Sequence, residues 1–125
     1  MRRRVVVQLF ESTSAVGGTV ETNFLDVEEF DEVVICIAPA GAAAGVFNAY
    51  AVSEKSAQFM FGNRGAIGAG QFWWYMLGFT APPTTDANVA LEGGPPVPRQ
   101  LRVTGPAGAG GTVTLLIYGV KYEES

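Results

Sequence analysis

Three consecutive segments decide the fold: Arg99-Gln-Leu-Arg-Val-Thr104, Gly105-Pro-Ala-Gly-Ala-Gly-Gly111 and Thr112-Val-Thr-Leu-Leu-Ile-Tyr-Gly-Val-Lys-Tyr122. The two outer segments are rich in β-branched and aromatic residues, which favour strands. A glycine-rich segment between two such runs predicts an antiparallel hairpin. The rest of the chain repeats this pattern, and no segment carries a clear helix signal. We therefore predict an all-β fold.

Seven further strand candidates precede this stretch, separated by clusters of Gly, Pro, Ser, Asn and Asp. They are Arg4–Glu11, Gly17–Val27, Glu32–Ala38, Val46–Ser53, Gln58–Phe61, Gln71–Thr80 and Asn88–Leu91. Short strands at such spacing predict a single antiparallel β-sandwich, jelly-roll-like, with about eight to nine strands in one domain over residues 1–125. The Glu32–Ala38 run is almost continuously apolar, which predicts burial on both of its faces.

The composition predicts a protein that hides apolar surface in an assembly. Charged residues make up 16% of the 125 residues and hydrophobic residues 48%, whereas about 25% of the residues in a typical globular domain are charged. Partner subunits are one way to cover the excess apolar surface, so we expect an oligomer. The net charge of −4 argues against a nucleic-acid or anionic-membrane partner, because both require a basic surface.

The N-terminus and the single cysteine add two expectations. The start of the chain, residues 1–4, contains three arginines and predicts a flexible basic arm that could contact an acidic stretch of another subunit. The apolar run after it is too short for a signal peptide, and no run is long enough to span a membrane. Cys36 cannot form an intramolecular disulfide, which fits a reducing cytoplasm. Because the chain has no histidine to activate it, we expect a buried, inert thiol.

The aromatic cluster Phe72-Trp-Trp-Tyr75 is the main candidate contact site. Side chains alternate between the two faces of a strand, so Phe72 and Trp74 share one face and Trp73 and Tyr75 share the other. One pair can belong to the core, and the second must face solvent, a ligand or a neighbouring subunit. Core and subunit packing, contact with a partner protein, and stacking on a sugar all remain open. The carbohydrate hypothesis uses Trp73 and Tyr75 as the exposed pair.

An acidic stretch that runs from the second strand candidate to the start of the third offers a different chemistry. It contains Glu21, Asp26, Glu28, Glu29, Asp31 and Glu32, with no basic residue among them. Carboxylates at this density could bind calcium or act as a pair of glycosidase acids. Apolar residues are interleaved with them, however, which favours a solvated connection whose charges protect a sheet edge. We therefore predict no catalytic residue, no metal site and no cofactor.

Four segments near the two ends of the chain carry a resemblance: Thr19–Val27, Phe30–Val34, Leu101–Gly105 and Gly111–Gly119. They resemble small β-sandwich virion proteins of tailed bacteriophages, and the middle of the chain is unmatched. The resemblance implies a head decoration (cement) protein or a small tail- or fibre-associated protein, located in the virion after assembly in the host cytoplasm. The partners implied are copies of the chain itself, with a trimer as one option, and the major capsid protein or another virion protein.

Together these features predict a non-enzymatic structural protein that oligomerises and binds a protein shell. The residues expected to make its contacts lie in the aromatic cluster and the basic arm: Phe72, Trp73, Trp74, Tyr75, Arg2, Arg3 and Arg4. The alternative is a carbohydrate- or ligand-binding sandwich that uses the aromatic face of Trp73 and Tyr75.

Overall fold

The computed structural model describes residues 2–40, 47–52, 58–64, 71–78, 89–107 and 110–124. In this part of the chain there are ten strands and no helix: β1 (Arg2–Thr13), β2 (Thr19–Glu21), β3 (Leu25–Asp26), β4 (Glu32–Ala40), β5 (Phe47–Val52), β6 (Gln58–Arg64), β7 (Phe72–Leu77), β8 (Val89–Gly93), β9 (Gln100–Pro106) and β10 (Thr112–Glu124). No helix in these ranges is long and apolar enough to cross a membrane. The all-β prediction is confirmed.

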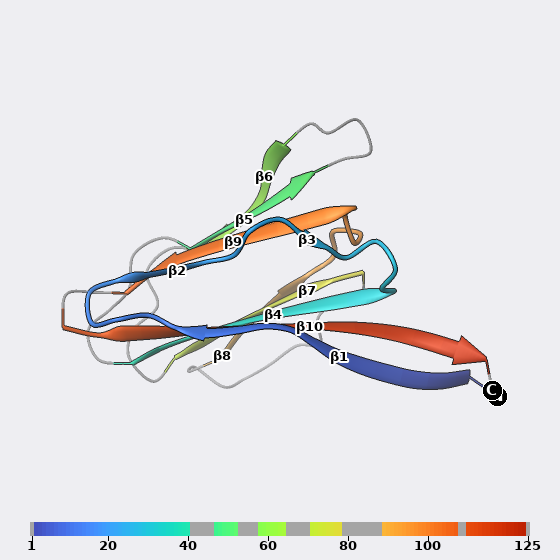
Figure 1. Ribbon diagram of the computed structural model, residues 1–125, viewed down its shortest axis with the longest axis horizontal. Coiled ribbons are helices and arrows are strands. Elements are labelled where there is room, and N and C mark those ends of the chain that lie inside the picture. The colour runs from blue at the N-terminus through green and yellow to red at the C-terminus, as the bar shows by residue number, and fades with distance from the viewer. Residues whose placement is uncertain are drawn as a thin grey trace.

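The strands form two sheets that lie one above the other (Figure 1). Sheet A has the order β1-β10-β4-β7-β8, and sheet B has the order β2-β9-β5-β6, with β3 also paired to β9. Every pair is antiparallel except β7 and β8, which run parallel. A parallel pair needs a crossover connection of about a dozen residues, and the chain between Leu77 and Val89 has about that length. The purely antiparallel sandwich that the sequence predicts is therefore wrong at this edge of sheet A.

The predicted hairpin at the end of the chain is also wrong, although both of its strands exist. β9 pairs with β2, β3 and β5 in sheet B, whereas β10 pairs with β1 and β4 in sheet A. The glycine-rich segment therefore carries the chain from one sheet to the other. The odd-numbered residues of each strand are mostly apolar, and placing the strands in opposite sheets lets these residues meet in the core between the layers.

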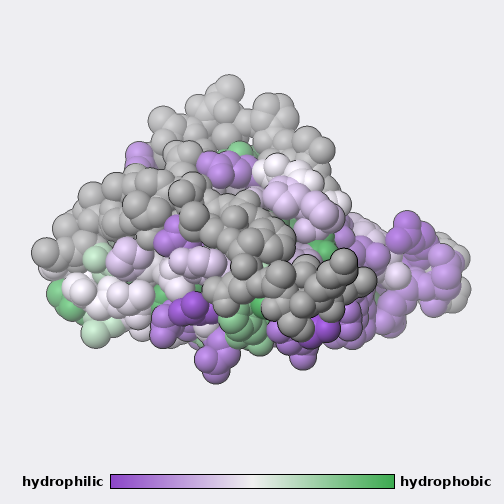
Figure 2. All heavy atoms as spheres, turned by 90° about the horizontal axis from the view of Figure 1, so that it is seen from above, coloured by the Kyte–Doolittle hydropathy of each residue, from purple (hydrophilic) through white to green (hydrophobic). Residues whose placement is uncertain are grey.

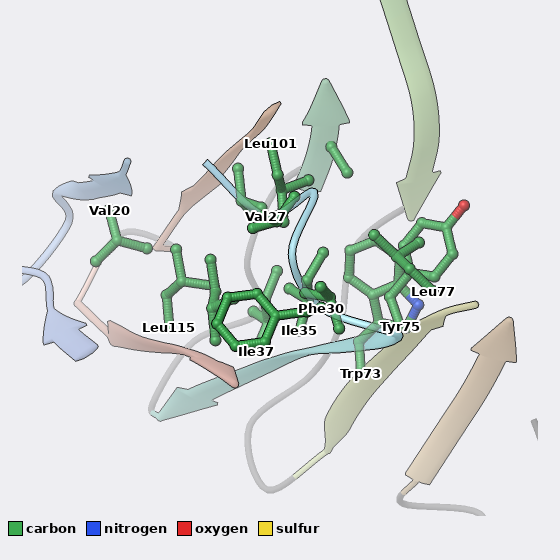
Figure 3. Close-up of a cluster of buried hydrophobic side chains, with 14 of the residues drawn as sticks. Val20, Val27, Phe30, Ile35, Ile37, Trp73, Tyr75, Leu77, Leu101 and Leu115 are labelled. Atoms are coloured by element: carbon green, nitrogen blue, oxygen red, sulfur yellow. The ribbon is translucent and has the colours of Figure 1, made fainter. Parts of the chain in front are cut away.

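The core lies between the two sheets and follows the two-residue period of the strands. Its buried members are Val20, Val27, Phe30, Val33, Ile35, Ile37, Ala49, Trp73, Tyr75, Leu77, Leu101, Val103, Val113, Leu115 and Ile117. Figure 3 shows Leu101 and Val27 on one side of this space and Ile35, Ile37 and Trp73 on the other. Three neighbouring strands of sheet A thus bury their odd-numbered residues and turn their even-numbered residues outward: β10 up to Gly119, β4 and β7.

Arg2–Arg4 are not the flexible arm that the sequence predicts, because they belong to β1. Arg2 is paired with Glu124, and the ladder continues without interruption to Gln8, which is paired with Tyr118. β4 begins opposite Val120 of β10, so the last residues of β10 and the first of β1 extend past the body as a two-stranded ribbon (Figure 1). The far end of this ribbon is hydrophilic (right, Figure 2).

The second predicted strand is broken into β2 and β3 by Thr22, which is buried. Its backbone N–H donates to the carbonyl oxygen of Val103 (2.9 Å), and its hydroxyl oxygen accepts a hydrogen bond from the N–H of Val103 (3.0 Å). The side chain therefore replaces a backbone acceptor at the point where the strand leaves the ladder, as threonine hydroxyls commonly do.

Replacing Thr22 by valine should cost about 1–3 kcal/mol of unfolding free energy, because the buried N–H of Val103 loses its acceptor. Thr22→Ser keeps the hydroxyl and is expected to cost less, even though it removes a buried methyl group. Urea unfolding of the two variants measures the difference. If the serine variant were the less stable of the two, packing of the methyl group would outweigh the hydrogen bond.

Candidate functional site

The aromatic cluster is divided between the core and the outside of sheet A. Trp73 is completely buried and Tyr75 is 5% exposed, and their ring centroids lie 5.2 Å apart. Phe72 is 39% exposed, and Trp74 is half-buried on the same outward side of β7. The prediction that Trp73 and Tyr75 are contact residues is therefore wrong, because strand alternation turns both side chains inward. The carbohydrate hypothesis built on their exposed rings is wrong for the same reason.

The register of sheet A places Trp74 in a row of apolar side chains that crosses the sheet. From β10 to β8 this row contains Leu116, Cys36, Trp74 and Leu91. The adjacent row contains Tyr118, Val34, Met76 and Gly93. On β10, β4 and β7 these residues alternate with the buried core residues of their strands, so their side chains point away from the core. We call this surface the outer face of sheet A.

The outer face has an apolar centre and a polar border. The two rows end on β1 at Glu11 and Gln8, and both of these residues are exposed. A third row begins with Thr13 and Thr114, whose hydroxyls lie 2.9 Å apart. On the three central strands, the charged side chains on the outward side are Glu32, at the start of β4, and Glu124, at the end of β10. Uncharged aromatic and Met side chains surrounded by polar ones are typical of protein–protein interfaces.

Cys36 lies in the middle of this face, between Leu116 and Trp74 in the register. It is 6% exposed, which confirms the predicted burial of the thiol. Burial raises the pKa of the Cys36 thiol from 9.0 to about 11, because the thiolate loses hydration. The outer face therefore excludes water at its centre.

Alkylation of Cys36 by iodoacetamide at pH 8 should be about a hundredfold slower in the folded protein than in the unfolded chain. The reason is the smaller thiolate fraction that follows from a pKa of about 11 in place of 9.0, since the thiolate is the nucleophile. The measurement compares modification rates by mass spectrometry with and without guanidinium. Equal rates would show that the thiol is solvated and that the centre of the outer face is open to water.

The arginines of the ribbon contact residues of their own chain. Arg3 forms an ion pair with Glu123 (3.1 Å), and the guanidinium of Arg2 lies 4.8 Å from the centre of the Tyr122 ring. The Tyr122 hydroxyl donates to Glu32 (2.6 Å), and this hydrogen bond is the main cause of the raised pKa of Tyr122. The ribbon is thereby held to the first residue of β4, and Arg2 and Arg3 contact residues of β10.

The acidic stretch does not gather into a metal site. Asp26 accepts a hydrogen bond from Gln100 (2.7 Å), Glu21 pairs with Arg102 (3.3 Å) and Glu29 pairs with Lys121 (3.8 Å). An open groove of about 630 Å³ is lined by Asp26, Glu28, Glu29 and Arg99. Within the described ranges, no group of three or more Asp, Glu, Cys or His side chains is placed to hold a metal ion.

Sequence reasoning missed most of the outer face because the contact residues that it named on this face were Phe72 and Trp74 of β7. Val34, Met76, Leu116 and Tyr118 complete the face. The sequence did contain a signal for this face. In Glu32–Ala38 and in Thr112–Val120, both the odd-numbered and the even-numbered positions carry apolar residues, so both faces of each strand are apolar. Such strands are typical of positions covered on both sides.

Comparison of the chain with protein-family models, with curated proteins and with solved structures gives no match.

Proposed function

We propose that this chain is a non-enzymatic structural protein of the virion, of the capsid-decoration kind, which oligomerises and attaches to a protein shell. The observation that carries the proposal is the outer face of sheet A. Its centre consists of Trp74, Met76, Leu116, Val34 and Cys36, uncharged side chains of a kind that interfaces favour and solvated surfaces do not.

Burial of this face supplies the free energy of assembly in the proposed mechanism. Apolar surface removed from water contributes about 25 cal/mol per Å², from which the entropy cost of association is subtracted. Phe72 borders the face on β7 and is 39% exposed, so a partner that covers Trp74 would also cover part of the Phe72 ring. Phe72 and Trp74 thus keep the contact role that the sequence predicts for them.

The strand pairing supports a jelly roll as the fold of this proposed virion protein. Five antiparallel pairings are nested like the two arms of one long ribbon: β1 with β10, β2 and β3 with β9, β4 with β7, and β5 with β6. Two lateral pairings, β10 with β4 and β9 with β5, close the ribbon into two sheets. A wrapped ribbon of this kind is the arrangement of jelly rolls, which virus capsid domains use widely. β8 is an addition at the edge of sheet A.

The edge strand β1 offers a second contact surface, for the shell. Val6 and Val7 are exposed by 48% and 37%, and β1 is an edge strand of sheet A. An exposed edge strand with apolar side chains is a template for pairing with another chain. In our proposal Arg2, Arg3 and Arg4, at the start of the same strand, steer this contact toward acidic groups of the shell protein.

The test is whether phage particles contain the chain. Particles purified from a culture that carries its gene should contain many copies each, measured by quantitative mass spectrometry. The chain should stay attached in about 1 M NaCl, where surface charges are screened, and should leave in urea, which weakens apolar contacts. Absence of the chain from purified particles would overturn the virion assignment. Release by salt alone would overturn attachment through an apolar face.

A further inference from the structure

We infer that the outer face of sheet A packs against the same face of a second copy of this chain, around a two-fold axis. This inference rests on the proposed function and names the partner of its principal surface. The resulting unit is a four-layer dimer with a sheet A from each copy in the middle. The ribbons and both B sheets remain available for other contacts.

The first step is that the central strand of sheet A is built for cover on both sides. β4 is the third of five strands, and Val33, Ile35 and Ile37 on its inner side are fully buried. On its outer side stand Val34, Cys36 and Ala38, which are also apolar. Sheet B covers only the inner side. A second apolar layer is therefore needed to complete the burial that the pattern of β4 specifies.

The second step is electrostatic. Each chain carries a net charge of −4, so two copies repel each other through most orientations. The two apolar rows carry no charged side chain between Leu116 and Leu91. Two copies can therefore approach face to face with their charges kept at the border. The polar groups in these rows are the hydroxyl of Tyr118 and the indole N–H of Trp74, so the face carries little that would specify a polar partner. Homodimer interfaces are characteristically of this apolar kind.

The third step concerns area. Five strands spaced about 4.8 Å apart give a face about 24 Å wide, and the six residues of β7 give it a length of about 20 Å. Each copy then contributes about 480 Å² in projection, and the pair buries about 1,000 Å², which is about the minimum area of a biological interface. Two sheets stack about 10 Å apart through interdigitating side chains. A two-fold contact closes after two copies, so it forms a discrete dimer.

The experiment measures solution mass by size-exclusion chromatography with light scattering. The wild-type protein should have twice the mass of the 13.2 kDa chain, or an even multiple of it. Trp74→Glu places a carboxylate in the middle of the face and should weaken the dimer at least about a hundredfold, because a charge buried without a partner is strongly unfavourable. Leu116→Glu on β10 should have the same effect. Val16→Glu is the matched control, since Val16 is 68% exposed and lies outside sheet A.

Circular dichroism confirms that each variant is folded. Should Trp74→Glu fail to fold, Leu116→Glu decides the result. A wild-type monomer at about 100 μM, a trimer, or dimers of both glutamate variants would overturn the inference. Those results leave the virion assignment intact if the chain is present in particles, so the two proposals fail separately. A monomer produced by Val16→Glu as well would also overturn it, because the effect would then be one of net charge.

Discussion

Replacing Trp73 by alanine is expected to destabilise the fold by about 3–5 kcal/mol, the cost typical of removing a fully buried aromatic side chain. Trp73 is completely buried in the core cluster, and its ring packs against that of Tyr75. Domains of this size have a total stability of about 5–15 kcal/mol. The variant should therefore unfold at a much lower urea concentration than the wild type.

Trp74→Ala is the matched control, because the two tryptophans are neighbours in β7 and face opposite sides of the sheet. In dilute solution it is expected to cost no more than about 1–2 kcal/mol, since the ring of Trp74 is half-buried in the single chain. Its larger effect should be on the dimer. Urea unfolding at low protein concentration measures the stability of the single chain separately from that of the proposed dimer. Equal losses of stability in both variants would contradict the assignment of Trp73 to the core and Trp74 to the surface.

Gly78→Ala is the second large expected effect, with a loss of about 2–5 kcal/mol. Gly78 has a φ of +89°, and a side chain in that region costs about 1–2 kcal/mol. In addition, a Cβ atom there would collide with the carbonyl oxygen of Asp31 and press on Val97. Relieving such overlaps typically costs about 1–3 kcal/mol. The N–H of Gly78 also donates to the carbonyl of Pro95 (2.8 Å), so the backbone has little freedom to move away.

Gly17→Ala separates the two causes. Gly17 has a φ of +70°, and no described atom lies within 4 Å of the position that its Cβ would take. The Gly17→Ala variant should therefore lose only the free energy that a side chain costs at a positive φ. Thermal unfolding of both variants measures the difference, which is the cost of the contact with Asp31. If the two variants lost the same stability, the close approach between Gly78 and Asp31 would carry no energetic weight.

Local sequence was sufficient to predict the existence of most strands, because β-branched and aromatic runs between glycine and proline clusters have few other stable conformations. It also predicted that Phe72 and Trp74 would share one face and Trp73 and Tyr75 the other, since this depends only on the geometry of a strand. Which pair would face the core was open. That choice depends on the sheet that β7 joins, and hence on residues distant in the chain.

The last third of the chain shows where local reasoning fails. The sequence alone determined that residues near 100–106 and 112–122 would be strands, and that Glu32–Ala38 would be apolar on both sides. Only the tertiary structure decided that β9 and β10 belong to different sheets, that Arg2–Arg4 are held against β10, and that the even-numbered residues of β4, β7 and β10 form one continuous face. Strand propensity acts within a few residues, whereas pairing depends on burying two apolar faces against each other across the whole chain. The candidate surface therefore exists only in the assembled sheet.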